Sequence, residues 1–96
     1  MTAKISGNYE SAEALALKAL AFLTADGDRL DQLLLASGIE PSDLKERSSD
    51  PHMLAGVLDH LLGNESLLLD FAAAMNVAPQ EIVRARQKLP GANFDT

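Results

Sequence analysis

Two stretches of the sequence, GIEPSDL at residues 38–44 and NVAPQEI at residues 76–82, share one pattern of residue types. Each begins with a glycine or an asparagine, which accept the left-handed conformation just beyond a helix end. A proline follows three residues later. Proline suits the first turn of a helix, because the amide proton that it lacks would have no partner there. Both stretches therefore predict a corner at which one helix ends and the next begins.

One apolar residue in each corner is expected to join the two helices. Ile39 and Val77 directly follow the turn residue, where a side chain can pack back on the helix that ends. Each also precedes an aliphatic residue of the next helix, Leu44 or Ile82, at the spacing of a hydrophobic staple. We therefore expect Ile39 and Val77 to be buried.

Helix signals continue on both sides of the corners. Leucine and alanine supply 17 and 15 residues, whereas valine and isoleucine together supply six, and this balance favours helices over strands. Asp28, Asp50 and Asn64 precede apolar runs at helical spacing, so we expect them to cap helices. The sequence therefore predicts an all-α, compact bundle of five to six short helices, at about residues 9–25, 29–37, from 41 onward, 51–62, 65–75 and 79–89.

The helices form one expected domain, residues 9–89, between a flexible N-terminus (residues 1–8) and a flexible C-terminal tail (residues 90–96). Within it the sequence echoes itself at an offset of 38 residues. Leu20 and Leu23 correspond to Leu58 and Leu61, and Leu33 corresponds to Phe71. This repeat suggests two three-helix units, about residues 9–47 and 50–89, although ordinary helix start and stop signals produce much of the same pattern.

The composition of the chain limits the classes of partner and the cellular location that we expect. The net charge of −6 opposes binding to phosphate backbones and to anionic membrane surfaces. The chain has no cysteine, which excludes disulfides and thiolate metal sites. No apolar run approaches the roughly 18 residues of a membrane span, and the alanine–leucine segment near the start lacks the basic flank of a secretion signal. We therefore expect a cytoplasmic protein with no membrane contact.

The run DPHMLAGVLDHLLGNESLLLDFAAAMNVAP at residues 50–79 resembles a bacterial family catalogued as domain of unknown function 3572, as do SAEALALKALAFL at residues 11–23 and LLLASGIEPSDL at residues 33–44. The resemblance covers about residues 11–91, and its most specific element is residues 57–71. It implies a small, helical, cytoplasmic bacterial protein. It supplies no activity, cofactor, ligand or catalytic residue.

The second corner also resembles the DNA-binding helix-turn-helix, here residues 66–89. The outer face of its second helix would carry Gln80, Arg84, Gln87 and Lys88, which are suited to base edges and phosphates. Glu81 near the start of that helix and the acidic chain oppose this reading, since phosphate neutralisation supplies much of the affinity for DNA. Arg86 lies nearer the apolar stripe of the helix and is expected to reach a neighbouring carboxylate.

The remaining polar residues predict no catalytic, cofactor or metal site, and hence no enzyme. His52, Asp59 and His60 share one helix, but the two histidines are eight residues apart rather than the four of a helical metal pair. Lys18 and Asp70 are lone charges that we expect to mark solvent-facing stripes.

A protein-interaction or adaptor module with an unknown protein partner is therefore the leading function, and nucleic-acid binding is the alternative. The run FAAAM at residues 71–75 would form a groove for a partner helix if one side of its helix is not covered internally.

Overall fold

The computed structural model of the chain describes the backbone of residues 7–90 and the side chains of residues 12–90. These residues form six helices and no strand, so the predicted all-α bundle is confirmed. Gly7 and Asn8 belong to the first helix and Pro90 lies in a turn, whereas residues 1–6 and 91–96 of the expected flexible ends lie outside the described residues. The helices are α1 (Gly7–Thr24), α2 (Gly27–Ser37), α3 (Pro41–Glu46), α4 (Pro51–Leu62), α5 (Glu65–Met75) and α6 (Pro79–Gln87).

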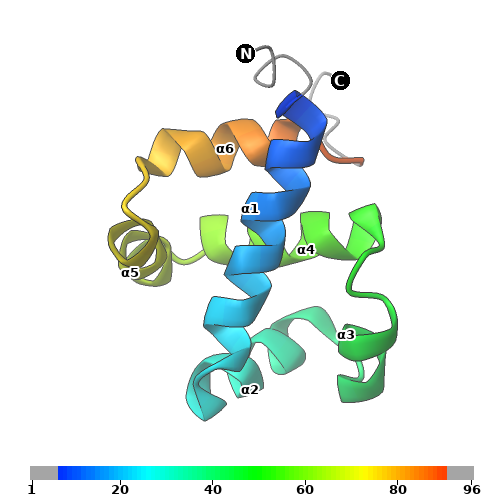
Figure 1. Cartoon of the computed structure of the whole chain (residues 1–96). Helices are drawn as coiled ribbons and strands as arrows, with labels where there is room; N and C mark the ends of the chain where they lie inside the picture. The colour runs from blue at the N-terminus through cyan, green and yellow to red at the C-terminus, as the bar shows by residue number, and fades with distance from the viewer. Residues whose placement is uncertain (1–6, 91–96) are drawn as a thin grey trace.

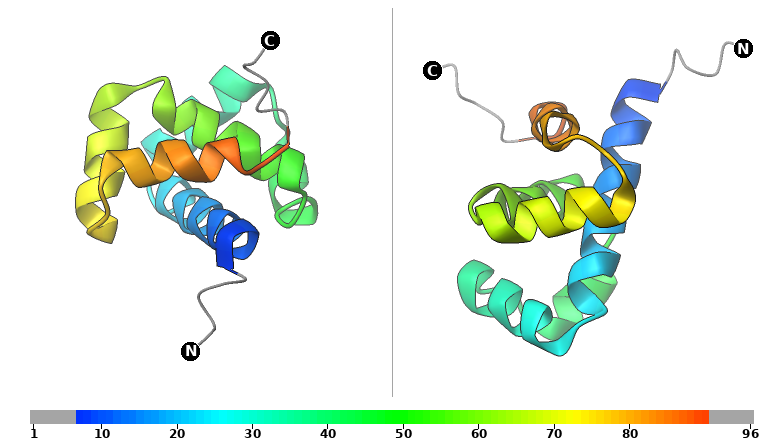
Figure 2. Two further views of the ribbon diagram at one scale, coloured as in Figure 1. Left: turned by 90° about the horizontal axis from the view of Figure 1, so that it is seen from above. Right: turned by 90° about the vertical axis from the view of Figure 1, so that its left-hand side faces the viewer.

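Three tiers of helices lie behind α1, which crosses all of them (Figure 1). α6 forms one outer tier, α4 and α5 the middle tier, and α2 and α3 the other outer tier, as the side view also shows (Figure 2). α1 packs on α2, α4 and α6, and α4 packs on α2, α5 and α6. Within the part of the chain that the structure describes, every helix is too short or too polar to cross a bilayer.

The helix starts of α4 and α5 follow the predicted caps. The Asp50 carboxylate accepts a hydrogen bond from the His52 amide at 3.0 Å, and the Asn64 side chain accepts one from the Leu67 amide at 3.2 Å. Each cap satisfies an amide that the first helical turn leaves without a partner. The predicted bounds of these two helices, 51–62 and 65–75, are confirmed.

The cap of α2 is Asp26, and the prediction of Asp28 is wrong. The Asp26 carboxylate accepts a hydrogen bond from the Arg29 amide at 3.1 Å, which is the third helical residue after it. Asp28 instead lies in the first turn, where its charge still favours the positive end of the helix dipole. The two aspartates stand two residues apart in sequence, and either could cap a helix that begins one residue later.

α6 ends at Gln87 rather than at Leu89. The amides of Lys88 and Leu89 bond to the carbonyl oxygens three residues earlier, those of Ala85 and Arg86, each at 3.1 Å. This tighter pattern is common in the last turn of a helix. Leu89 nevertheless remains buried in the core.

The core is built mainly from the leucines of α1, α2 and α4, together with Leu67 and Phe71 of α5 and Ile82 of α6. Alanines on α1 permit its close approach to the other helices, because Ala16 and Ala19 are fully buried and carry only a methyl group. The rings of Phe22 and Phe71 meet edge to face, with centroids 5.3 Å apart. The largest fully buried side chains are Phe71, Leu23, Leu33, Leu54, Leu58, Leu61, Ile82 and Val57.

The internal echo is visible in the first two helices of each half but not in the third. Leu23 and Leu61 are both fully buried, as are Leu33 and Phe71. The third helices differ, because α6 packs on both α1 and α4, whereas Leu44 is the one buried residue of α3. The two halves are therefore alike in pattern and unlike in packing.

Both corners have the predicted left-handed residue, and they differ in their hydrogen bonds. Gly38 has φ 72° and Asn76 has φ 59°. In the second corner the Val77 amide bonds to the Ala72 carbonyl at 3.0 Å, which completes a Schellman motif. In the first corner, the Ile39 amide instead donates to the Ser37 hydroxyl oxygen at 3.2 Å.

Ile39 and Val77 are half-buried, whereas the sequence predicted full burial. Both side chains pack against the edge of the core. Each corner lies at the end of two helices, where neighbouring elements cover only the inward side of the residue. Each corner residue therefore packs on the core with part of its side chain in solvent.

Candidate functional site

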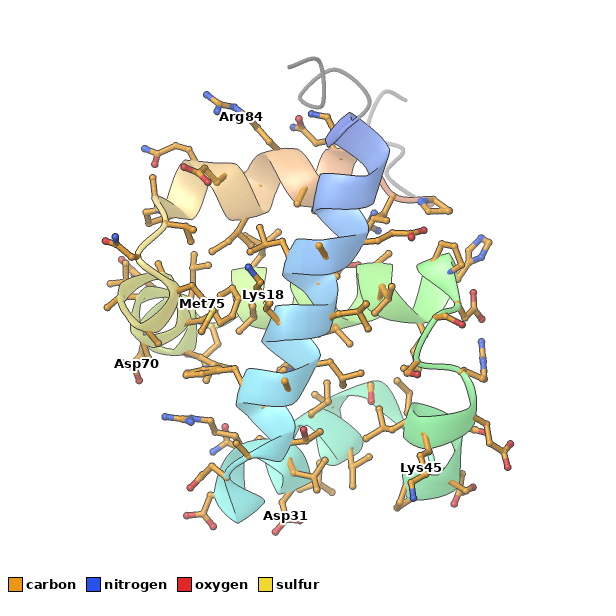
Figure 3. The ribbon with its side chains drawn as sticks, viewed as in Figure 1. Lys18, Asp31, Lys45, Asp70, Met75 and Arg84 are labelled. Atoms are coloured by element: carbon orange, nitrogen blue, oxygen red, sulfur yellow. The ribbon has the colours of Figure 1, made fainter. Side chains whose placement is uncertain are left out.

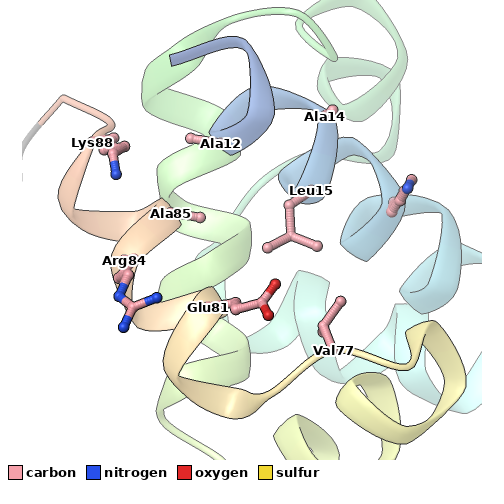
Figure 4. Close-up of a pocket in the computed structure, with 9 residues that line it drawn as sticks. Ala12, Ala14, Leu15, Val77, Glu81, Arg84, Ala85 and Lys88 are labelled. Carbon is pink, nitrogen blue, oxygen red and sulfur yellow. The ribbon is translucent and has the colours of Figure 1, made fainter. Parts of the chain in front are cut away.

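An open groove of about 410 Å³ lies between α1, α6 and the corner that leads into α6. Its floor is apolar and consists of Ala12 and Leu15 from α1, Val77 from the corner and Ala85 from α6. Ala12 and Ala85 are buried, and their short side chains leave space between the two helices that longer ones would fill. Leu15 and Val77 are half-buried and point into this space together with Glu81 (Figure 4).

Three cations line the same groove. Lys18 belongs to α1, Arg84 belongs to α6, and Lys88 directly follows the last residue of α6. All three side chains are exposed, and within residues 12–90 no ion pair holds any of them. Among residues 12–90, Glu81 is the one acidic residue of the lining, so the formal charge of the described lining is +2, from three cations and one anion. This contrasts with the net charge of −6 for the chain.

The other arginines of the described chain are engaged elsewhere. The Arg29 guanidinium lies over the Phe22 ring, 4.1 Å from its centroid. The Arg47 and Asp50 side chains form an ion pair at 2.9 Å, which raises the pKa of Arg47 and lowers that of Asp50. Arg86 is paired with Asp59. The three cations of the groove, by contrast, form no ion pair or cation–π contact with the other residues that the structure describes.

The predicted nucleic-acid-binding residues, Gln80, Arg84, Gln87 and Lys88, are all exposed; the first three lie on α6 and Lys88 directly follows it. The structure divides them into two groups, because Arg84 and Lys88 line the groove beside α1 and the two glutamines do not. The two cations therefore border a hollow that α1 also lines, rather than a face that only α6 forms. Their neighbour across the groove, Lys18, was expected only to face solvent.

The sequence predicted no functional site at Lys18. Its signal was a single charge on an otherwise apolar helix, which indicates that one face meets solvent. Lys18 and Asp70 do both face solvent, as expected (Figure 3). Only the packing of α1 on α6 brings Lys18 beside residues 66 positions later in the chain.

His52, Asp59 and His60 have separate neighbours. His52 lies in the first turn of α4, with its Nδ1 atom 3.7 Å from the Asp50 carboxylate. Asp59 is paired with Arg86, and His60 is half-buried, with a pKa lowered by burial. Among residues 12–90, no group of three or more histidine or acidic side chains is placed to hold a metal ion.

A second hollow, of about 390 Å³, lies near the other end of α1. Its lining is mainly apolar and includes one cation, Lys45 of α3. Lys45 and Arg84 lie at opposite ends of the molecule (Figure 3). Neither hollow is lined by α5, so the groove suggested for residues 71–75 is not one of these two. Ala73 and Ala74 of that segment are nevertheless exposed.

Comparison with known proteins places the chain in a family without assigned activity. The family described as protein of unknown function (DUF3572) matches residues 9–92, which include all of α2 to α6 and most of α1. The resemblance in the sequence is thereby confirmed. No curated protein and no solved structure matches the chain.

Proposed function

We propose that this chain, which belongs to the family DUF3572, is a protein-interaction module whose contact surface is the groove between α1 and α6. The observation that carries the proposal is the combination of an apolar floor with cations that form no ion pair within residues 12–90. Leu15 and Val77 keep part of their apolar surface in water. A partner side chain that covers this surface would gain the free energy of apolar burial.

The exposed face of α1 can enlarge the contact. A stable interface buries about 800 Å² on each partner, which is more than the floor of one shallow groove provides. Ala14 lines the groove and is exposed, and Leu17 follows it by three residues with 43% of its surface exposed. Residues three apart share one face of a helix. A partner seated in the groove would therefore also cover Leu17.

Binding fits this groove better than catalysis. A nucleophile or general base acts together with a partner group that activates it. The described lining holds one carboxylate, that of Glu81, and no histidine, serine or threonine. The proposal therefore gives the lining side chains the role of recognising a partner.

Nucleic-acid binding through α6 is the second candidate. Its support is the exposure of Gln80, Arg84, Gln87 and Lys88 on, or directly after, one helix that follows a tight corner. Against it stand Glu81, which lines the groove beside Arg84, and the net charge of −6. Phosphate contacts supply most non-specific affinity for DNA, so this acidic chain would bind duplexes weakly.

Affinity purification with and without nuclease separates the two candidates. We expect a protein partner whose recovery survives nuclease treatment. Recovery should be lost for Ala14→Trp, whose uncharged indole would fill the groove, and retained for the matched control Ala36→Trp on the exposed end of α2. Recovery that depends on intact nucleic acid would contradict the proposal. Equal recovery with both variants would show that the groove is not the contact surface.

A further inference from the structure

We infer that the groove between α1 and α6 binds an acidic protein segment that carries an apolar side chain between its carboxylates. The inference rests on the proposed function, because it names the chemistry of the partner for the same groove. Its basis is the distribution of charge over the whole molecule. Three steps lead from that distribution to the partner.

First, the cations of the chain are unevenly distributed between contacts within the fold and the groove. Seven of the eight lysines and arginines lie within residues 12–90. Arg29 lies over an aromatic ring, and Arg47 and Arg86 are paired with acids. Lys45 lines the second hollow. The other three, Lys18, Arg84 and Lys88, line this groove. Nearly half of the described cations therefore converge on one small surface of an acidic protein.

The second step is the arrangement of these cations around the apolar floor. Lys88 directly follows α6 and stands four residues after Arg84, so the two lie about one turn apart on one side of the end of the helix. Lys18 lines the groove from α1. Positive charge therefore flanks Leu15 and Val77 on two helices. A segment that placed an apolar side chain on this floor would bring neighbouring carboxylates to both walls.

The third step concerns the acidic groups on this protein. Glu81 points into the groove beside Leu15 and Val77, so it would face a hydrogen-bond donor of the segment, such as a backbone amide (Figure 4). The rest of the surface is acidic and would repel the same segment elsewhere. Like-charge contacts of this kind suppress incorrect placements and define the register of a complex.

An acidic protein segment suits the groove better than a nucleic acid does. Duplex DNA carries one charge about every 1.7 Å along its axis. A duplex long enough to reach all three cations would also place phosphates near Glu81 and near the surrounding acidic surface. A protein segment can carry a few carboxylates beside one apolar side chain. We therefore take a protein segment as the ligand of the groove. Binding of duplex DNA is the alternative result that the test can reveal.

The test uses the full chain and a synthetic peptide with a central leucine between glutamates. A second peptide has lysine in place of each glutamate, and a third has alanine in place of the leucine. Titration followed by amide chemical shifts would measure affinity and location together. We expect the acidic peptide to change the amide chemical shifts of α1 and α6 and to bind more tightly than either of the other peptides. Its affinity should fall as the salt concentration rises.

Charge-changed variants test the role of the cations directly. The triple variant Lys18→Glu, Arg84→Glu, Lys88→Glu should weaken binding of the acidic peptide by about tenfold or more, since three ion pairs are reversed. Lys45→Glu, in the second hollow, is the matched control and should bind as the native chain does. Because all four side chains are exposed, the helical spectrum should not change. A triple variant with glutamine at the three positions replaces the first if it fails to fold.

The outcomes separate this inference from the proposed function. If the acidic and lysine peptides bind equally, or the triple variant binds the acidic peptide as the native chain does, the inference is wrong. The proposed function would still stand if Ala14→Trp abolished recovery of a cellular protein. If mixed-sequence duplex DNA bound more tightly than the acidic peptide and lost its affinity in the triple variant, both would be overturned in favour of a nucleic-acid-binding α6.

Discussion

The Arg86 guanidinium of α6 and the Asp59 carboxylate of α4 form a two-point ion pair, with Nε–Oδ1 and Nη2–Oδ2 distances of 2.6 and 3.1 Å. The side chain of Arg86 is 11% exposed, whereas that of Asp59 is 56% exposed. Arg86 also donates from Nη1 to the Pro90 carbonyl oxygen at 3.2 Å. One side chain therefore joins two helices and binds a carbonyl beyond the end of α6, and the expectation of a carboxylate partner is confirmed.

Arg86→Ala should lower the free energy of unfolding by about 1–3 kcal/mol, because it removes charge-assisted hydrogen bonds and the packing of a mostly buried stem. Arg86→Lys should recover only part of this loss, since an ammonium group cannot form the two-point pair. Urea denaturation would measure both. A double-mutant cycle with Asp59→Ala isolates the pair itself. A loss below about 0.5 kcal/mol for Arg86→Ala would place it among ordinary surface substitutions and contradict a structural role.

Alanine at Gly38 and alanine at Gly56 should change stability in opposite directions. A Cβ atom at either glycine would meet nothing within 4 Å, so packing does not decide the sign. Gly38→Ala should cost about 1–2 kcal/mol, because φ of 72° is unfavourable for residues with a Cβ. Gly56→Ala, inside α4, should stabilise the fold by about 0.5–1 kcal/mol. Thermal unfolding would measure both, and a shift of the same sign in both variants would contradict this account.

Aspartate at Ile39 or Val77 tests the two corners. Both side chains are half-buried, so each substitution should cost about 1–3 kcal/mol, less than for a fully buried position. Leu35→Asp is the control, because Leu35 is 85% exposed, and it should change stability by less than about 0.5 kcal/mol. Chemical denaturation of the three variants would compare them. Equal losses at all three positions would contradict the packing of the corners against the core.

His60 should make stability depend on pH. Burial lowers its pKa in the folded chain below the ordinary value of 6.5, so the unfolded chain takes up the proton first as the pH falls. The contribution of neutral His60 to stability is therefore fully present above pH 6.5, and it is lost as the pH falls through that value towards the folded pKa. His60→Gln should reduce the loss of stability over this interval. Denaturation at a series of pH values would measure it, and an unchanged pH dependence would contradict the prediction.

Several features of the fold could be predicted because they depend on residues close together in the chain. Capping bonds reach two or three residues, as at Asp50 and Asn64, and a left-handed helix end depends on the residue that occupies it, as at Gly38 and Asn76. The choice of Asp28 over Asp26 failed for the same local reason. Both are acceptable caps, and nothing beyond the neighbouring residues separated them.

The sequence by itself determined the helical class, most helix ends and the expectation that Arg86 would find a carboxylate. Only the tertiary structure decided that this carboxylate is Asp59, that Ile39 and Val77 keep part of their surface in water, and that Lys18 lines the same groove as Arg84 and Lys88. Helix ends depend on hydrogen bonds within one turn, whereas the contact between α1 and α6 depends on how all their side chains pack together. Small residues such as Ala12 and Ala85 allow that contact without specifying it, because alanines are frequent throughout the chain.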